Sequence, residues 1–213
     1  MKAARIATLL VLPLLGGCVT GKFVYTPPTE RAATLNSIEI ARPIDGVWAT
    51  AIPALGRHFF VVNTIDRSSG FVNLSYSGGP EQFVDCGEIS STVANAAGER
   101  TYSFPASRSS QYYERTADGR LFQIDRRASL DGRVNLIFEA IGPNRTRVTI
   151  TTRYVFTRES QVTTVGTGIS RSLRDSISFN TNQSGRFQPD LRSVAVTCYA
   201  TGKLEADLLN LLR

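Results

Sequence analysis

Alternation of apolar and polar residues predicts several strands in the first half of the chain. The earliest such stretch is 35–41, and the segments 59–65 and 71–76, rich in aromatic and β-branched residues, flank a polar loop at 66–70 that ends in Gly. This arrangement is typical of a β-hairpin. A further short strand is expected at 82–87, after the Gly- and Pro-containing break that follows the hairpin.

The longest alternating pattern lies in the second half of the chain and predicts a three-strand meander. Its strands are 121–128, 133–141 and 145–157, with turns expected at Leu130-Asp131-Gly132 and Gly142-Pro143-Asn144. One face of these strands is apolar and is expected to meet a helix. The other face carries Glu139, Arg147 and Arg153, which we interpret as solvated surface and not as a site.

Apolar residues recur at helical spacing in two places, and each place predicts a helix. The first follows Pro43 and puts Trp48 on an apolar stripe with Ile44, Val47, Ala51, Ile52 and Leu55, while Pro53 and Gly56 indicate its end. The second closes the chain, with Leu204, Leu208, Leu211 and Leu212 on one stripe and Thr201 or Gly202 as its cap. We expect both helices to pack on the sheet; docking of the second on a partner is the alternative.

Three segments lack a clear period. Residues 18–33 are expected to form a tether, and residues 160–172, rich in Thr, Gly and Ser, a flexible crossing loop. Residues 88–119 mix small polar residues with aromatics, and we expect one or two irregular strands around a loop at 105–110. Exposed loops with aromatics are common contact sites, so 88–119 is the first candidate for a binding surface; packing under a long loop is the alternative.

Together these elements predict an α+β fold, in which an antiparallel sheet carries an N-terminal-half helix and a C-terminal helix on one face. Residues 34–213 are expected to form a single domain, with the last strands at 176–180 and 192–199. Trp48, Phe60-Val61-Val62, Ile65-Asp66 and Gly70-Phe71-Val72 resemble the helix-grip modules of BamC-like outer-membrane lipoproteins. The resemblance is local and made of structural positions, so it implies a strand-helix-hairpin start and no catalytic residue.

The N-terminus has the three parts of a secretory signal. Lys2 and Arg5 precede an apolar run at 7–15 that is too short to span a bilayer stably. Leu15-Gly16-Gly17-Cys18 resembles the bacterial lipobox, which implies that residues 1–17 are removed and that Cys18 is acylated, for example with palmitate. An ordinary secretory signal is the alternative. Val19 and Thr20 are not acidic, and among lipoproteins this implies the outer membrane, with the domain in the periplasm.

Composition and charge are those of a folded, mildly basic protein. Apolar residues make up 42% of the chain and charged residues 20%, which are globular values. The net charge is +6 for the 213 residues, and it falls to +4 once Lys2 and Arg5 leave with the signal. Because the basic residues are scattered, apart from Arg126-Arg127, we interpret them as solvated surface and expect no nucleic-acid partner.

With Cys18 taken by lipid, Cys86 and Cys198 are the two thiols that remain. In an oxidising compartment we expect them to form a disulfide that closes a loop of 112 residues, with two separately buried thiols as the alternative. No metal site is expected, because His58 is the single histidine and neither cysteine has a close partner at ligand spacing.

No stretch of the chain carries a recognisable catalytic or cofactor motif. A Ser-His-Asp mechanism would have to use His58, and no Ser lies in a nucleophile elbow. We therefore expect no enzyme and no cofactor, and a lipid-anchored cell-envelope protein that acts as a protein-interaction or structural module. The alternative is a module that binds a lipid or another hydrophobic small molecule in a sheet-helix cavity. A hydrolase using His58 is the third hypothesis.

Overall fold

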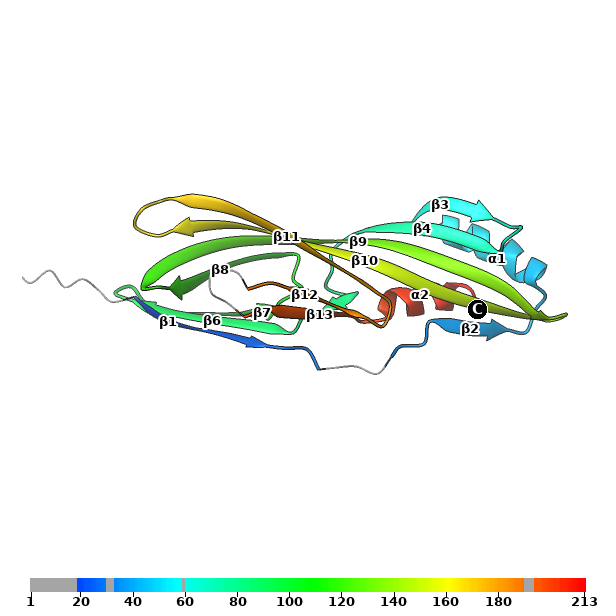
Figure 1. Ribbon diagram of the computed structural model, residues 1–213, viewed down its shortest axis with the longest axis horizontal. Helices are drawn as coiled ribbons and strands as arrows, with labels where there is room; N and C mark the ends of the chain where they lie inside the picture. Colours follow the sequence, from blue (N-terminus) through cyan, green and yellow to red (C-terminus); the bar gives the residue numbers. More distant parts are fainter. Residues whose placement is uncertain (1–18, 30–32, 59, 190–193) are drawn as a thin grey trace, which may run out of the picture.

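The chain forms an elongated, mostly β structure (Figure 1). The computed structural model describes residues 19–29, 33–58, 60–189 and 194–213. Of these, 61% lie in strands and 12% in two short helices. The expected α+β fold of helix-grip type is therefore wrong: the molecule is β-rich. The reason is that segments without an obvious period, which we interpreted as tether and loops, form strands.

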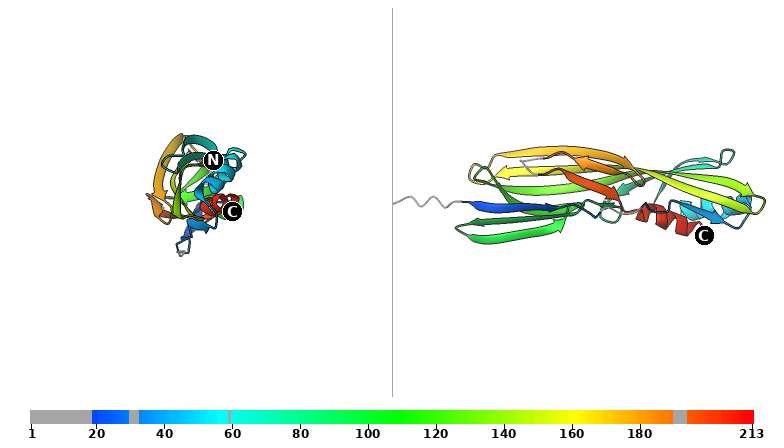
Figure 2. Two further views of the ribbon diagram at one scale, coloured as in Figure 1. Left: turned by 90° about the vertical axis from the view of Figure 1, so that its right-hand side faces the viewer. Right: turned by 60° about the horizontal axis from the view of Figure 1, so that its bottom comes forward.

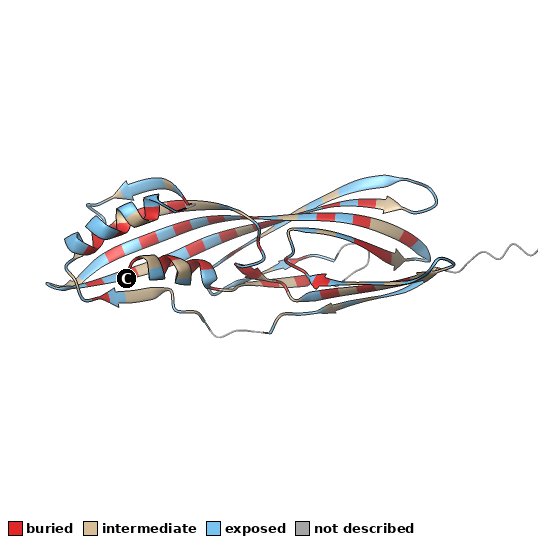
Figure 3. Ribbon diagram, turned by 180° about the vertical axis from the view of Figure 1, so that it is seen from behind, coloured by how far each residue is buried: buried red, intermediate tan, exposed pale blue. Residues whose placement is uncertain are grey.

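Two long antiparallel strands, β9 (Arg120–Gly142) and β10 (Arg145–Thr164), run along the molecule and form its spine. Buried and exposed residues alternate along both (Figure 3). The expected turn at 142–144 joins them, but the expected turn at 130–132 does not exist, because β9 continues through it. Gly132 lies within β9, opposite Tyr154 of β10. A side chain at this position would contact Leu204 of the C-terminal helix.

The large sheet is built on both sides of this spine. Its order is β11 (Ser170–Asn180), β10, β9, β4 (Phe71–Gly78) and β3 (Val61–Asp66). In addition, β2 (Ser37–Ile40) pairs with the start of β10, and β8 (Ser110–Ala117) pairs with the start of β9. All pairs are antiparallel. The expected crossing loop at 160–172 is thus wrong, since β10 and β11 leave only residues 165–169 as a turn, in which Gly166 and Gly168 have positive φ.

The elongated molecule has the shape of a rod, and in one half of this rod helices lie on the inner face of the large sheet. Helix α1 (Ile44–Gly56) and helix α2 (Lys203–Leu211) lie at the positions expected from the apolar spacing. The Trp48 ring packs against Phe138 of β9 with 5.1 Å between ring centroids, and Leu204 and Leu208 of α2 are fully buried. Pro53 lies inside α1 near its C-terminal end, where little of the helix remains to be disrupted.

In the other half, two small sheets cover the inner face of the large one, as the rotated views of Figure 2 show. One consists of β1 (Thr20–Thr26), β6 (Glu88–Asn95) and β7 (Gly98–Pro105), and the other of β12 (Ser184–Phe187), β13 (Val196–Ala200) and β5 (Val84–Asp85). The tether expected over 18–33 is therefore a strand for much of its length, and the irregular segment 88–119 is three regular strands.

The core of this second half contains arginines, which corrects the interpretation of the basic residues as solvated surface. Arg115, Arg126 and Arg158 are at most 7% exposed. Their guanidinium carbons lie 4.2, 5.2 and 4.5 Å from the ring centres of Phe23, Phe104 and Phe187, which come from the covering strands. Cation–π contacts thus join the two layers.

Candidate functional site

The cysteine pair predicted from the sequence is confirmed. Cys86 follows β5 and Cys198 lies on β13; both side chains are fully buried and their sulfurs are bonded. The bond lies beside the two register pairs that join β5 to β13, so it holds a very short strand in its sheet. Cys18, the expected acylation site, lies outside the described residues.

The candidate residue for hydrolytic chemistry, His58, is exposed just after α1. Within the described ranges, no three His, Cys, Asp or Glu side chains are close enough together to hold a metal ion. Neither of the two helices that the structure describes is long and apolar enough to cross a membrane.

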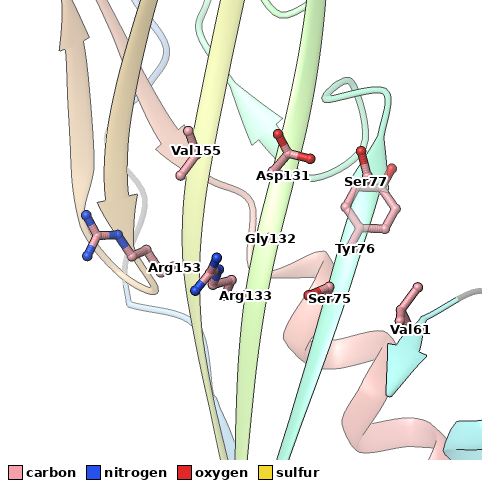
Figure 4. A pocket seen from close by; sticks show the side chains of 9 residues that line it. All are labelled: Val61, Ser75, Tyr76, Ser77, Asp131, Gly132, Arg133, Arg153 and Val155. Atoms are coloured by element: carbon pink, nitrogen blue, oxygen red, sulfur yellow. The ribbon is translucent and has the colours of Figure 1, made fainter. Parts of the chain in front are cut away.

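The outer face of the large sheet carries a groove in the middle of the rod, where β4, β9 and β10 lie side by side (Figure 4). Its volume is about 620 Å³. The side chains that line it, together with Gly132, are those of Val61, Ser75, Tyr76, Ser77, Asp131, Arg133, Arg153 and Val155. It therefore combines two guanidiniums, one carboxylate, hydroxyl groups and small apolar surfaces in one open site.

Arg133 and Arg153 are direct cross-strand partners in the register of β9 and β10. Both are exposed, and in the part of the chain that the structure describes neither has an ion-pair partner. Figure 4 shows the Arg133 guanidinium leaning toward β10 while the Arg153 side chain extends from β10 away from it. Like charges directly opposite each other destabilise a sheet. A bound anion would offset this repulsion.

Other arginines on the same outer face have carboxylate partners. Arg147 bonds Glu39 at 2.9 Å, and Arg145 also contacts that carboxylate. Arg174 of β11 lies 3.1 Å from Glu159 of β10. Arg133 and Arg153 differ from these three arginines in having no such partner in the described part of the chain.

Polar side chains continue from the groove toward β3. Asn63 donates to Asn73 at 2.8 Å and to Ser75 at 2.7 Å, and Asn73 donates to Asn135 at 2.7 Å. This row lies beside Arg133 and connects the groove to the edge strand β3, where Val61 is 63% exposed. Guanidinium groups bind carboxylates in a bidentate manner, and hydroxyl and amide groups bind peptide backbone. The groove is thus suited to an acidic polypeptide segment.

The space between helices and sheet has a different character, because side chains fill it. Val47, Ala51 and Leu55 of α1 are at most 1% exposed, and so are Leu136 and Ile150 on the facing strands. This close packing does not favour the alternative of a hydrophobic ligand held between sheet and helices.

The sequence pattern does not predict this groove. The pattern predicts Arg153 on a solvated face and Arg133 at the start of a separate strand. The register that places the two arginines opposite each other depends on the turn at Pro143-Asn144 and also on a β-bulge between Arg145 and Thr146, which shifts the pairing by one residue. The candidate contact segments 88–119 and 160–172 are instead regular strands around the second half of the rod.

Comparison with known proteins identifies no relative: no protein-family model, no curated protein and no solved structure matches the chain.

Proposed function

We propose that the protein is a lipid-anchored, non-catalytic interaction module of the cell envelope, and that its groove binds an acidic segment of a partner protein. The observation that carries this proposal is the unpaired, directly opposed pair of Arg133 and Arg153. Carboxylates of a partner segment would offset the two like charges and gain charge-assisted hydrogen bonds from the guanidiniums.

The anchor is supported by the sequence of the N-terminus. A signal with basic residues and a short apolar run ends at Cys18, and acyl chains on a cysteine hold a protein firmly at a bilayer. The non-acidic residues after Cys18 favour the outer membrane, with the rod in the periplasm. Replacement of Cys18 by Ala tests the anchor directly: the protein should leave the membrane fraction and keep its disulfide.

A protein partner is favoured over a nucleic acid by the charges of the groove. Asp131 lines it with the two arginines, and the mature chain carries a net charge of only +4. A phosphate backbone requires a continuous basic surface, whereas an acidic peptide requires only a few well-placed guanidiniums. The exposed edge of β3 beside the groove adds backbone groups that an extended segment could pair with.

The partner can be captured in cells with a photo-cross-linking amino acid at Ser75, inside the groove, and at Thr101, an exposed position of β7, as the control. We expect a defined adduct from position 75 alone, identified by mass spectrometry. Arg133→Ala with Arg153→Ala should abolish it, whereas Arg145→Ala with Arg147→Ala, which removes the arginines that already bond Glu39, should leave it. No adduct, or one that survives the loss of Arg133 and Arg153, would contradict the proposal.

A further inference from the structure

Three turns and the first described strand meet at one end of the rod, the left end in Figure 1. The turns join β6 to β7, β8 to β9 and β10 to β11. A side chain added at Gly21 of β1 would collide with Thr116 of β8, and Thr116 lies opposite Leu121. The Leu121 carbonyl in turn accepts a hydrogen bond of 2.9 Å from the Val165 N–H. We call this end the N-terminal pole.

The β10–β11 turn at this pole exposes aliphatic side chains. Val165 is 42% exposed and Ile169 is 69% exposed. Apart from the segment before β2, no large apolar side chain in the described residues has a larger exposed fraction than Ile169. Both line a groove of about 670 Å³ between this turn and the β8–β9 turn, with Phe122 beside them. Exposed aliphatic groups gathered in this way are typical of a surface that contacts a protein or a membrane.

Basic side chains surround these aliphatic groups. Arg120 and Arg171 line the same groove, and Lys22 is exposed on β1. Asp118 of the β8–β9 turn lines this groove too, and Glu99 on β7 is a further acidic group at the pole. Guanidiniums beside aliphatic side chains match the interface of a bilayer, where lipid phosphates lie above the first methylene groups.

The length of the chain before β1 limits how far this pole can lie from the lipid anchor. Cys18 precedes Thr20, the first residue of β1, by two positions. Two extended residues span at most about 7 Å. Acyl chains on Cys18 would therefore hold the N-terminal pole, and no other part of the rod, within reach of the lipid headgroups.

We infer that the N-terminal pole is a membrane-contacting surface, with Val165 and Ile169 inserted among the uppermost acyl chains and with Arg120 and Arg171 on lipid phosphates. This inference rests on the proposed function in that acylated Cys18 supplies the attachment. The rod then projects from the bilayer, with α1 and the β9–β10 turn at its far end. The groove at Arg133 stands midway, clear of the membrane and open to a partner.

The test uses full-length protein in vesicles of phosphatidylethanolamine and phosphatidylglycerol whose acyl chains are brominated, because bromine quenches tryptophan fluorescence at close range. Trp48, the single tryptophan, is replaced by Phe so that a new one reports alone. Ile169→Trp places the probe at the pole. Ile137→Trp is the matched control, since Ile137 is also an exposed aliphatic residue but lies on β9 in the half with the helices.

We expect a loss of emission and a blue shift for Ile169→Trp and neither for Ile137→Trp. Further change of Arg120 and Arg171 to Glu should weaken the quenching. Equal quenching at both positions, or none at position 169 in vesicle-bound protein, overturns the inference. Mass spectrometry of the N-terminus separates the two proposals. Acylation without quenching contradicts only the membrane contact of the pole, and quenching without acylation contradicts only the lipid anchor. If neither is observed, both proposals are wrong.

Discussion

The Tyr154 hydroxyl lies 2.9 and 2.8 Å from the two carboxylate oxygens of Glu205, and both residues are fully buried. Thr181 donates to the same carboxylate at 2.7 Å. These contacts join α2 to the middle of the spine, near the point where a side chain added at Gly132 would meet Leu204. Burial, and then the charge of Glu205, raise the pKa of Tyr154, so the hydroxyl keeps its proton and remains a donor.

Replacement of Glu205 by Ala should therefore destabilise the fold. It removes the acceptor of the buried Tyr154 hydroxyl, and an unsatisfied buried group costs about 1–3 kcal/mol. Urea denaturation followed by circular dichroism measures the loss. Asp207→Ala is the control, because Asp207 makes an exposed pair with Lys203 on the same helix and should cost at most about 0.5 kcal/mol. Equal effects of the two changes would show that the buried contact does not hold α2.

A second prediction concerns acid stability. Glu114 is 6% exposed and accepts bonds from Arg100 Nε at 2.8 Å and Nη2 at 2.7 Å. Burial raises the pKa of Glu114, but the bonds and the charge of Arg100, together with hydrogen bonds from Gln123 and Tyr112, outweigh it and hold the pKa below its usual range. A carboxylate with a lowered folded-state pKa stabilises the fold above its unfolded pKa, and loses this effect as the pH falls through the folded value.

The difference in unfolding free energy between wild type and Glu114→Gln should accordingly be largest near neutral pH and shrink below about pH 4.3, the unperturbed value. Denaturation series at several pH values measure it. Arg100→Gln breaks the same pair from the other side and should show the same pH dependence. A difference that is constant or grows in acid would contradict the role of this pair.

A third prediction concerns the disulfide. Its loop of 112 residues gives an entropic stabilisation of about 4–5 kcal/mol on the chain-entropy model. The double change of Cys86 and Cys198 to Ala should lower the urea midpoint strongly. Cys18 supplies the control, since Cys18→Ala should leave the midpoint of the domain unchanged. An unaltered midpoint without the disulfide would show that β5 and β13 hold together by packing alone.

The elements with strong periodicity could be predicted from the sequence, and the segments without it could not. The spacing around Trp48 and Leu204 predicts α1 and α2, and the hairpin of β3 and β4 is also as expected. In β1, Phe23 and Tyr25 alternate inward, but Gly21 and the prolines after the strand concealed this period. The decisive contacts of β1, such as the bonds between the Tyr25 hydroxyl and the backbone of Thr197, are distant in sequence.

Asp131-Gly132 shows why the groove was missed. This dipeptide is a typical hairpin signal, yet both residues lie in an unbroken strand. Tertiary packing decides the outcome: Gly132 lies against Leu204, Thr152 and Tyr76, while Asp131 faces outward into the groove. Local sequence does not contain these contacts, so it could place neither the continuous strand nor the site that depends on its register.

The last prediction separates stability from function at the groove. Arg153→Glu would place a carboxylate opposite Arg133 and replace repulsion by attraction, so the fold should gain about 0.2–1 kcal/mol. The same change removes one guanidinium and occupies the other, so the adduct from position 75 should disappear. Arg147→Glu is the control, because it breaks a bond with Glu39 and should lower stability while the adduct persists. Urea denaturation and the cross-linking assay measure both. If the Arg153→Glu variant is less stable, or still forms the adduct, the proposal that Arg133 and Arg153 repel each other and bind the partner is contradicted.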